Sequence, residues 1–262
     1  MGEIAWYLYV AVIAAGFAAG FINTVAGSGS LITLPLLIFL GLPATVANGT
    51  NRVAILLQNV VGVSSYRQQK ILDFRGGLIL ALPALVGAIV GARIAVDLDE
   101  VLMRRVIGGL MVLMLIVMMI RPNRWLTGQA GEPLRRFRLK ESLVFFAIGV
   151  YGGFIQAGVG IFLLAGLVLG AGYDLVRANA IKVFIVLIYT PLALAIFVFN
   201  HQVHWGMGLT LAVGNMLGAL VASRLAVRKG APFVRFILIA VIAVSAIKFL
   251  GIWDYVLSTL NL

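Results

Sequence analysis

Apolar stretches almost long enough to cross a lipid bilayer recur along this chain, separated by short polar or glycine-rich interruptions. In the first half they cover about Ile4–Ile22, Ala44–Tyr66, Gly77–Val96 and Leu102–Ile120. A helix needs roughly 20 apolar residues to cross the hydrocarbon core. A membrane barrel would instead alternate apolar and polar positions. The pattern therefore predicts a helical membrane protein with many spans.

One interruption falls where a span should simply continue. Glycine, serine and amide side chains fill Asn23–Ser30, and the apolar run that follows, Leu31–Gly41, has only about eleven residues. At roughly 1.5 Å per residue this run covers about half of the hydrocarbon thickness. Non-helical backbone at membrane depth is tolerated only where protein buries it or where it lines a cavity. We therefore predict a helix break followed by a half-helix, and a site around the break.

Composition agrees with this class and narrows the chemistry. Hydrophobic residues make up 62% of the chain and charged residues only 11%, which excludes a soluble domain. The net charge of +11 does not indicate nucleic-acid binding, because the basic residues lie in short loops between spans. Cysteine is absent, and His201 and His204 have no acidic neighbour, so we expect no metal and no cofactor. The first apolar segment lacks a basic leader and a cleavage signature, so we expect it to be retained as a span.

The second half of the chain repeats the first at an offset of 131 residues. The matches are Gly27 and Gly29 with Gly158 and Gly160, Gly41 with Gly172, Ala47–Asn48 with Ala178–Asn179, Gly87–Ala88 with Gly218–Ala219, Arg93 with Arg224, and Arg104 with Arg235. Upstream, Gly20–Asn23 matches Gly153–Gln156 at an offset of 133. The sequence thus predicts an all-α polytopic membrane protein, with repeats at 1–120 and 142–262 joined by a linker at 121–141. Each repeat has about five helical segments, giving roughly eight full spans and two short half-helices. Such duplication is common in transporters.

Loop charges predict that the two repeats are inverted relative to one another. The loop at 67–75 carries Arg67, Lys70 and Arg75, whereas the equivalent loop at 200–205 has no Lys or Arg. The loop at 96–101 carries three acids, whereas its equivalent is only basic. Because Lys and Arg accumulate on the cytoplasmic side, the linker 121–141 is predicted to be cytoplasmic and both termini outside. Basic residues at 93, 104 and 105 on the outer side oppose this assignment.

In an inverted duplication the two breaks meet near the bilayer midplane, where such folds bind substrate. Half-helices that begin near Ser30 and Ile161 would aim unpaired N–H groups at the centre and attract an anion. The predicted substrate-binding residues are Asn23, Thr24, Gly27, Ser28, Gly29, Ser30, Asn48, Thr50, Asn51, Arg52, Gln156, Gly158, Gly160, Asn179 and Lys182. Further candidates for lining the cavity are Gln58, Asn59, Tyr189 and Asn215. We expect an asymmetric site, since Val159 and Ile161 replace the two serines of the first repeat.

Simpler roles stay open for the strongest of these candidates. Arg52 and Lys182 could anchor helix ends at the membrane interface. Asn48 and Asn179 could cap helices or form interhelical hydrogen bonds. The Gly-x-x-x-Gly pairs that begin at residues 16, 87, 149 and 214 are interpreted as helix-packing motifs.

Acidic residues are absent from every predicted span interior. All nine lie in loops or at segment ends. A proton-driven carrier normally has a titratable group inside the membrane, so the sequence offers no carboxylate for proton coupling and disfavours cation transport. It predicts instead an anion carrier, either passive or driven by Na⁺ held on hydroxyls and carbonyls.

The motifs resemble those of the sulfite exporter TauE/SafE family, also called the toluene sulfonate uptake permeases. The resemblance rests on Gly20-Phe21-Ile22, Gly27-Ser28-Gly29, Leu34-Pro35-Leu36-Leu37, Gly41-Leu42-Pro43 and Ala47–Asn51, with a diverged second copy that has Ala180 and Ile181 in place of Gly49 and Thr50. It implies a bacterial inner-membrane transporter, not an enzyme, for sulfite, sulfonates, sulfoacetate or related small anions, in either direction. Transport of another small anion such as a carboxylate, or a role as a non-transporting membrane subunit, are the alternatives.

Overall fold

The fold is known from a computed structural model, which describes residues 6–120 and 139–249. These residues form helices and no strands, so the all-helical prediction is confirmed. The elements in order are α1 (Trp6–Val25), α2 (Ser30–Phe39), α3 (Ala44–Gln68), α4 (Phe74–Val96), α5 (Glu100–Ile120), α7 (Leu139–Phe154), α8 (Val159–Ala165), the π-helical turn η1 (Gly166–Gly170), α9 (Leu175–Phe199) and α10 (Trp205–Phe249).

Four helical stretches of the described residues are long and apolar enough to cross a membrane. They are Leu8–Val25, Phe74–Val96, Leu175–Phe199 and Trp205–Val234. Two short apolar helices, Ser30–Phe39 and Val159–Gly170, stand where the half-helices are predicted. Helix α3 has 25 residues, but polar side chains fill its second and third turns and reduce its hydropathy. The chain is therefore a multi-pass membrane protein by these helices.

The backbone repeats with the register seen in the sequence. Helices α3 and α9 have the same length and bounds 131 residues apart, and α4 and α10 begin 131 residues apart. Positive φ angles recur in the same way, at Gly27 and Gly158, at Gly41 and Gly172, and at Lys70 and His201. Of the predicted linker, residues 121–138 lie outside the described part of the chain, and α7 already begins at Leu139.

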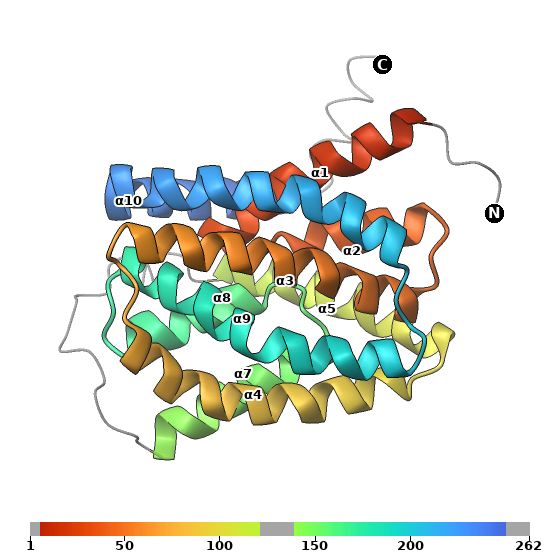
Figure 1. The fold of residues 1–262 in the computed structure, drawn as a ribbon, viewed down its shortest axis with the longest axis horizontal. Helices are drawn as coiled ribbons and strands as arrows, with labels where there is room; N and C mark the ends of the chain where they lie inside the picture. The colour runs from red at the N-terminus through yellow and green to blue at the C-terminus, as the bar shows by residue number, and fades with distance from the viewer. Residues whose placement is uncertain (1–5, 121–138, 250–262) are drawn as a thin grey trace.

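The helices stack in layers, with α1 and α10 on one side, α4 and α7 on the other, and α3 and α9 between them (Figure 1). Glycines allow the outer pairs to pack closely. A Cβ on Gly20 would overlap the backbone of Asn215 in α10, and a Cβ on Gly153 would overlap that of Ala88 in α4. The other glycines of the four Gly-x-x-x-Gly pairs behave alike, so their predicted packing role is confirmed.

The two central helices run antiparallel. Gly49 near the start of α3 lies beside Phe197 near the end of α9, and Gly62 lies beside Val183. Both helices are buried along most of their length. Their polar side chains are therefore held inside the protein.

The central helices begin with different caps. The side chain of Asp174 accepts hydrogen bonds from Val176 and Arg177 N–H at the start of α9, both 3.0 Å. At the start of α3 the acceptor is Glu100 from α5, which binds Ala44 N–H at 2.8 Å and Thr45 N–H at 3.3 Å. Burial raises the pKa of Glu100, but these two hydrogen bonds and Arg104 together hold it below its usual value.

Candidate functional site

The two helix breaks are in direct contact. The first separates α1 from α2 and the second separates α7 from α8, and each turns on a glycine with positive φ, 81° at Gly27 and 72° at Gly158. Gly160 N–H donates a hydrogen bond to the Gly27 carbonyl across the contact, 3.2 Å. A Cβ on either residue would overlap the Cα of the other. The contact therefore requires glycine at both positions, and at Gly27 the backbone angle requires it again.

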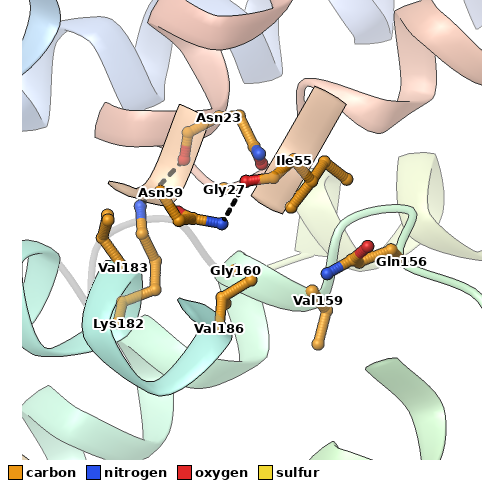
Figure 2. A pocket seen from close by; sticks show the side chains of 10 residues that line it. All are labelled: Asn23, Gly27, Ile55, Asn59, Gln156, Val159, Gly160, Lys182, Val183 and Val186. Carbon is orange, nitrogen blue, oxygen red and sulfur yellow. Dashed lines mark hydrogen bonds between the residues drawn. The ribbon is translucent and has the colours of Figure 1, made fainter. Parts of the chain in front are cut away.

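Lys182 closes the broken end of α1. Its Nζ donates to the carbonyls of Asn23 (3.0 Å) and Thr24 (2.8 Å), in the last turn of α1, and to Oδ1 of Asn179 (2.7 Å). Three acceptors match the three N–H donors of an ammonium group. A cation at a helix C-terminus also complements the partial negative charge of the helix dipole. Figure 2 shows the ammonium reaching Asn23 from α9.

Arg52 closes the broken end of α7 in the same manner. Its guanidinium donates to the carbonyls of Gly152 (3.1 Å), Gly153 (2.5 Å) and Phe154 (3.4 Å). It also lies over the ring of Phe197, 4.6 Å from the centroid. Each cation therefore comes from one repeat and holds the broken helix of the other.

This role differs from both roles considered for these cations in the sequence. A snorkelling anchor would keep its head group near water, whereas Arg52 is 0% exposed and Lys182 2%. Asn48 is likewise no helix cap: its amide donates to the Phe154 carbonyl at 2.8 Å, an interhelical hydrogen bond beside Arg52. Asn179 serves as an acceptor for Lys182 one turn along its own helix.

The centre of the molecule carries an excess of positive charge. Each break supplies about half a negative charge at one helix end and half a positive charge at the next, and these cancel. The ion pairs found in the described residues, Arg104–Glu100 and Arg177–Asp174, lie at exposed helix ends. Across residues 6–120 and 139–249, no carboxylate is buried with Arg52 or Lys182. Two full positive charges are thus left uncompensated.

A small cavity lies where the breaks meet (Figure 2). It is lined by Asn23, Gly27, Ile55, Asn59, Gln156, Val159, Gly160, Lys182, Val183 and Val186. It has room for about one water molecule, less than a sulfonate needs. The conformation described is therefore closed around its centre.

The cavity gathers only part of the predicted site. It contains the predicted Asn23, Gly27, Gln156, Gly160 and Lys182, and Asn59 of the predicted lining. Its aliphatic walls were not predicted, because nothing distinguishes four aliphatic residues in a chain built largely of them. Phe197 under Arg52 escaped prediction for the same reason.

Several buried polar atoms near the breaks have no hydrogen-bond partner among the described residues. Four of them are donors: the hydroxyls of Thr24 and Ser28, Nε of Arg52 and Nδ2 of Asn179. Oxygens of Asn48 and Gln156 are also unpartnered within the same part of the chain. Buried unsatisfied groups are rare in folded proteins, and each needs an explanation. Donors of this kind suit a bound oxyanion.

Other predicted site residues hold helices together. Asn51 accepts from Thr33 at 2.7 Å and donates to Ser30 at 3.2 Å, which fastens α2 to α3. The Thr50 hydroxyl accepts from His204 N–H at 2.8 Å, at the start of α10. Gly158 precedes α8 with a left-handed conformation, and Gly29 packs against the Ala19 carbonyl of α1.

The predicted lining residues also join helices. Gln58 accepts hydrogen bonds from Asn23 and from Asn215, both 3.2 Å, and so links α3 with α1 and α10. In the other repeat, the Gln156 amide donates to the hydroxyls of Tyr189 (3.5 Å) and Thr190 (3.2 Å). These side chains orient the two amides that line the cavity, Asn23 and Gln156.

Long apolar helices, a pair of apposed helix breaks and buried cations together are features of polytopic membrane transporters. Residues 12–249 match the sequence profile described as sulfite exporter TauE/SafE. The chain belongs to this family of membrane transporters.

Relatives support the same class. The chain is 30% identical over 251 residues to "Probable membrane transporter protein ORF9" of Sinorhizobium sp, covering 96% of this chain and 95% of the relative. It is 25% identical over 233 residues to "Probable membrane transporter protein YfcA" of Escherichia coli K12, covering 88% and 86%. It is 25% identical over 261 residues to "Probable membrane transporter protein YjnA" of Bacillus subtilis, covering 91% and 98%. No solved structure matches the chain at a significant level.

Proposed function

We propose that this protein is a secondary transporter or uniporter for a small anion of the sulfite and sulfonate class, bound where the two helix breaks meet. The observation that carries the proposal is the burial of Arg52 and Lys182 at the breaks, with no carboxylate buried beside them in the described residues. An uncompensated charge inside a membrane is costly and marks a site of function. An anion is the ligand that reduces this cost.

A sulfur oxyanion fits the surrounding donors. Sulfite and sulfonates present three oxygens around one sulfur, and each oxygen accepts hydrogen bonds. The free donors of Thr24, Ser28, Arg52 and Asn179 come from both repeats and so approach the centre from different helices. The family description supports the sulfur class. A carboxylate has two oxygens and would use fewer of these donors.

We propose further that the two repeats are inverted and that transport proceeds by alternating access. The antiparallel course of the equivalent helices α3 and α9 supports inversion, since repeats of like orientation would place them parallel. The closed cavity and the Gly27–Gly160 hydrogen bond support a cycle in which the breaks separate to admit the anion. Loop charges support a location in the bacterial inner membrane, with 121–141 cytoplasmic and both termini outside.

The orientation can be tested with single cysteines, because the natural chain has none. We expect a membrane-impermeant maleimide to label Gln202→Cys in whole cells and to label Arg67→Cys only after permeabilisation. Labelling of both positions from the same side would contradict the inverted arrangement.

The transport activity can be tested with purified protein in proteoliposomes. We expect uptake of labelled sulfite or a small sulfonate above that of protein-free vesicles, and loss of that uptake in Arg52→Ala. Arg67→Ala removes an exposed charge from the same helix and should transport normally. Flux of carboxylates with none of sulfur anions would shift the substrate class. Absence of flux across the whole anion panel would favour a non-transporting subunit.

A further inference from the structure

The position of Lys182 bears on how the proposed transport is driven, and the inference below rests on that proposed function. The ammonium lies among oxygen atoms only: two backbone carbonyls at the unwound end of α1, at 2.8 and 3.0 Å, and Oδ1 of Asn179 at 2.7 Å. A fourth oxygen belongs to the same turn, since the Thr24 hydroxyl is buried and has no partner among the described residues.

Oxygen atoms arranged in this way form the usual setting for a coupling cation. In transporters with broken helices, unwound carbonyls and the C-terminal ends of half-helices coordinate Na⁺. Hard cations also prefer carbonyl, amide and hydroxyl oxygens as ligands. Here the carbonyls are already bound by a covalently attached cation of the protein itself.

We propose that the ammonium of Lys182 occupies the position of a coupling Na⁺, so that the protein carries its anion without Na⁺, and that shortening this side chain opens the position to Na⁺. The sequence alone left Na⁺ as a possible partner held on hydroxyls and carbonyls. The structure assigns those carbonyls to Lys182 instead. The positive charge that neutralises the α1 end is then fixed in the protein and does not cross the membrane.

The other break supports the same assignment. The unwound carbonyls at the end of α7 are bound by the guanidinium of Arg52, which is always charged. Both broken helix ends in the described structure are thus neutralised by side chains. Neither leaves its carbonyls free for a mobile ion.

The test compares Na⁺ with other cations at equal ionic strength, using the purified full chain in detergent. Thermal unfolding is measured in the chlorides of Na⁺, K⁺ and N-methylglucamine. For the wild type we expect the same Tm in all three. For Lys182→Ala we expect a saturable rise of about 3–6 °C when Na⁺ is tenfold above its Kd, with no rise in the other two salts.

Two controls separate a specific site from a general salt effect. Lys182→Met removes the charge but keeps a long side chain in the position, so it should show no response to Na⁺. Lys140→Ala removes one exposed charge at the start of α7 and should behave like the wild type. An equal Na⁺ response in all variants, or none in Lys182→Ala, would overturn the proposal.

A second measurement holds even where Lys182→Ala does not fold. Anion uptake by the wild type in proteoliposomes should be the same with Na⁺ or N-methylglucamine outside. Uptake that falls at least tenfold without Na⁺ would overturn the proposal. The thermal measurement needs no transport, so a failure of the proposed function, seen as no anion flux at all, is distinguishable from a failure of the Na⁺ assignment.

Discussion

The two helix breaks share a backbone but differ in their side chains. Each turns on a glycine with positive φ, and each ends a helix whose carbonyls are bound by a buried cation from the other repeat. The first break carries Ser28, where the second has Val159 at the equivalent position. The cations differ as well: Lys182 directs one ammonium at three oxygens, whereas Arg52 spreads its fork over three carbonyls and stacks on Phe197.

The difference shows what duplication has retained. Arg52 and Lys182 are one position out of register between the repeats, so neither descends simply from the other's place in the helix. Both nevertheless neutralise a broken helix end across the repeat interface. The breaks therefore retain geometry and charge, while the hydroxyl donors are concentrated in the first.

The largest expected effect is at Arg52. We predict that Arg52→Ala lowers the free energy of unfolding by about 3–5 kcal/mol, because three buried carbonyls lose a charged donor. Arg52→Lys keeps the charge but loses the fork and the stacking on Phe197, so it should recover only part of this loss. Thermal unfolding in detergent measures both. If Arg52→Ala were as stable as the wild type, the capping role of Arg52 would be wrong.

The contact between the breaks comes next. Gly27→Ala must accept a positive φ, at about 1–2 kcal/mol, and also push the second break away, at a further cost of about 1–3 kcal/mol. Gly41→Ala is the matched control, because Gly41 also has a positive φ (93°) but no atom within 4 Å of an added Cβ. It should lose only the conformational part. Equal losses of stability in the two variants would show that the breaks do not need to touch.

The caps of the two central helices should differ in their pH dependence. Asp174→Ala should cost about 1 kcal/mol, as for other helix N-caps. Glu100→Gln tests the cap supplied to α3 from α5. The folded-state pKa of Glu100 is lowered, so its stabilisation is present above the usual carboxyl pKa, about 4.3, and is lost as the pH falls through the folded value. Unfolding curves of wild type and Glu100→Gln should therefore differ at neutral pH and converge in acid. A difference independent of pH would exclude this role for the carboxylate.

The smallest effects on stability are expected at the serines of the first break. The Ser28 hydroxyl is buried without a partner in the described structure, so Ser28→Ala should be neutral or slightly stabilising while weakening anion binding. Ser30→Ala loses the hydrogen bond from Asn51 and should cost about 1 kcal/mol with little effect on binding. The reverse result in paired unfolding and binding measurements would place the anion elsewhere.

The sequence is informative about the backbone of this protein and less so about the roles of its side chains. The short helix after Asn23–Ser30 is where the pattern predicts it, because a glycine-rich interruption and a run of about eleven apolar residues leave few alternatives. The roles of Thr50 and Asn51 could not be foreseen. A polar residue in an apolar helix pairs with whatever the fold brings to it, here His204 and Thr33.

The cavity walls and the cation roles were hidden for related reasons. Ile55 and Val186 resemble every other aliphatic residue of the chain until the breaks are placed against α3 and α9. The sequence marked Arg52 and Lys182 as functional because charge is rare in its spans. It gave no sign that their first partners are carbonyls of the opposite repeat, because backbone acceptors leave no trace in composition.

The central claim is that positive charge at the apposed breaks selects an anion, and a pair of ligands of similar shape tests it most directly. Methanesulfonate and dimethyl sulfone both have tetrahedral sulfur bonded to carbon and oxygen, but only the first is charged. In thermal unfolding of the purified wild type, methanesulfonate should raise the Tm in a saturable manner and dimethyl sulfone should not, because a ligand stabilises only the state that binds it. An equal response to both ligands, or a response to the sulfone alone, would contradict the account.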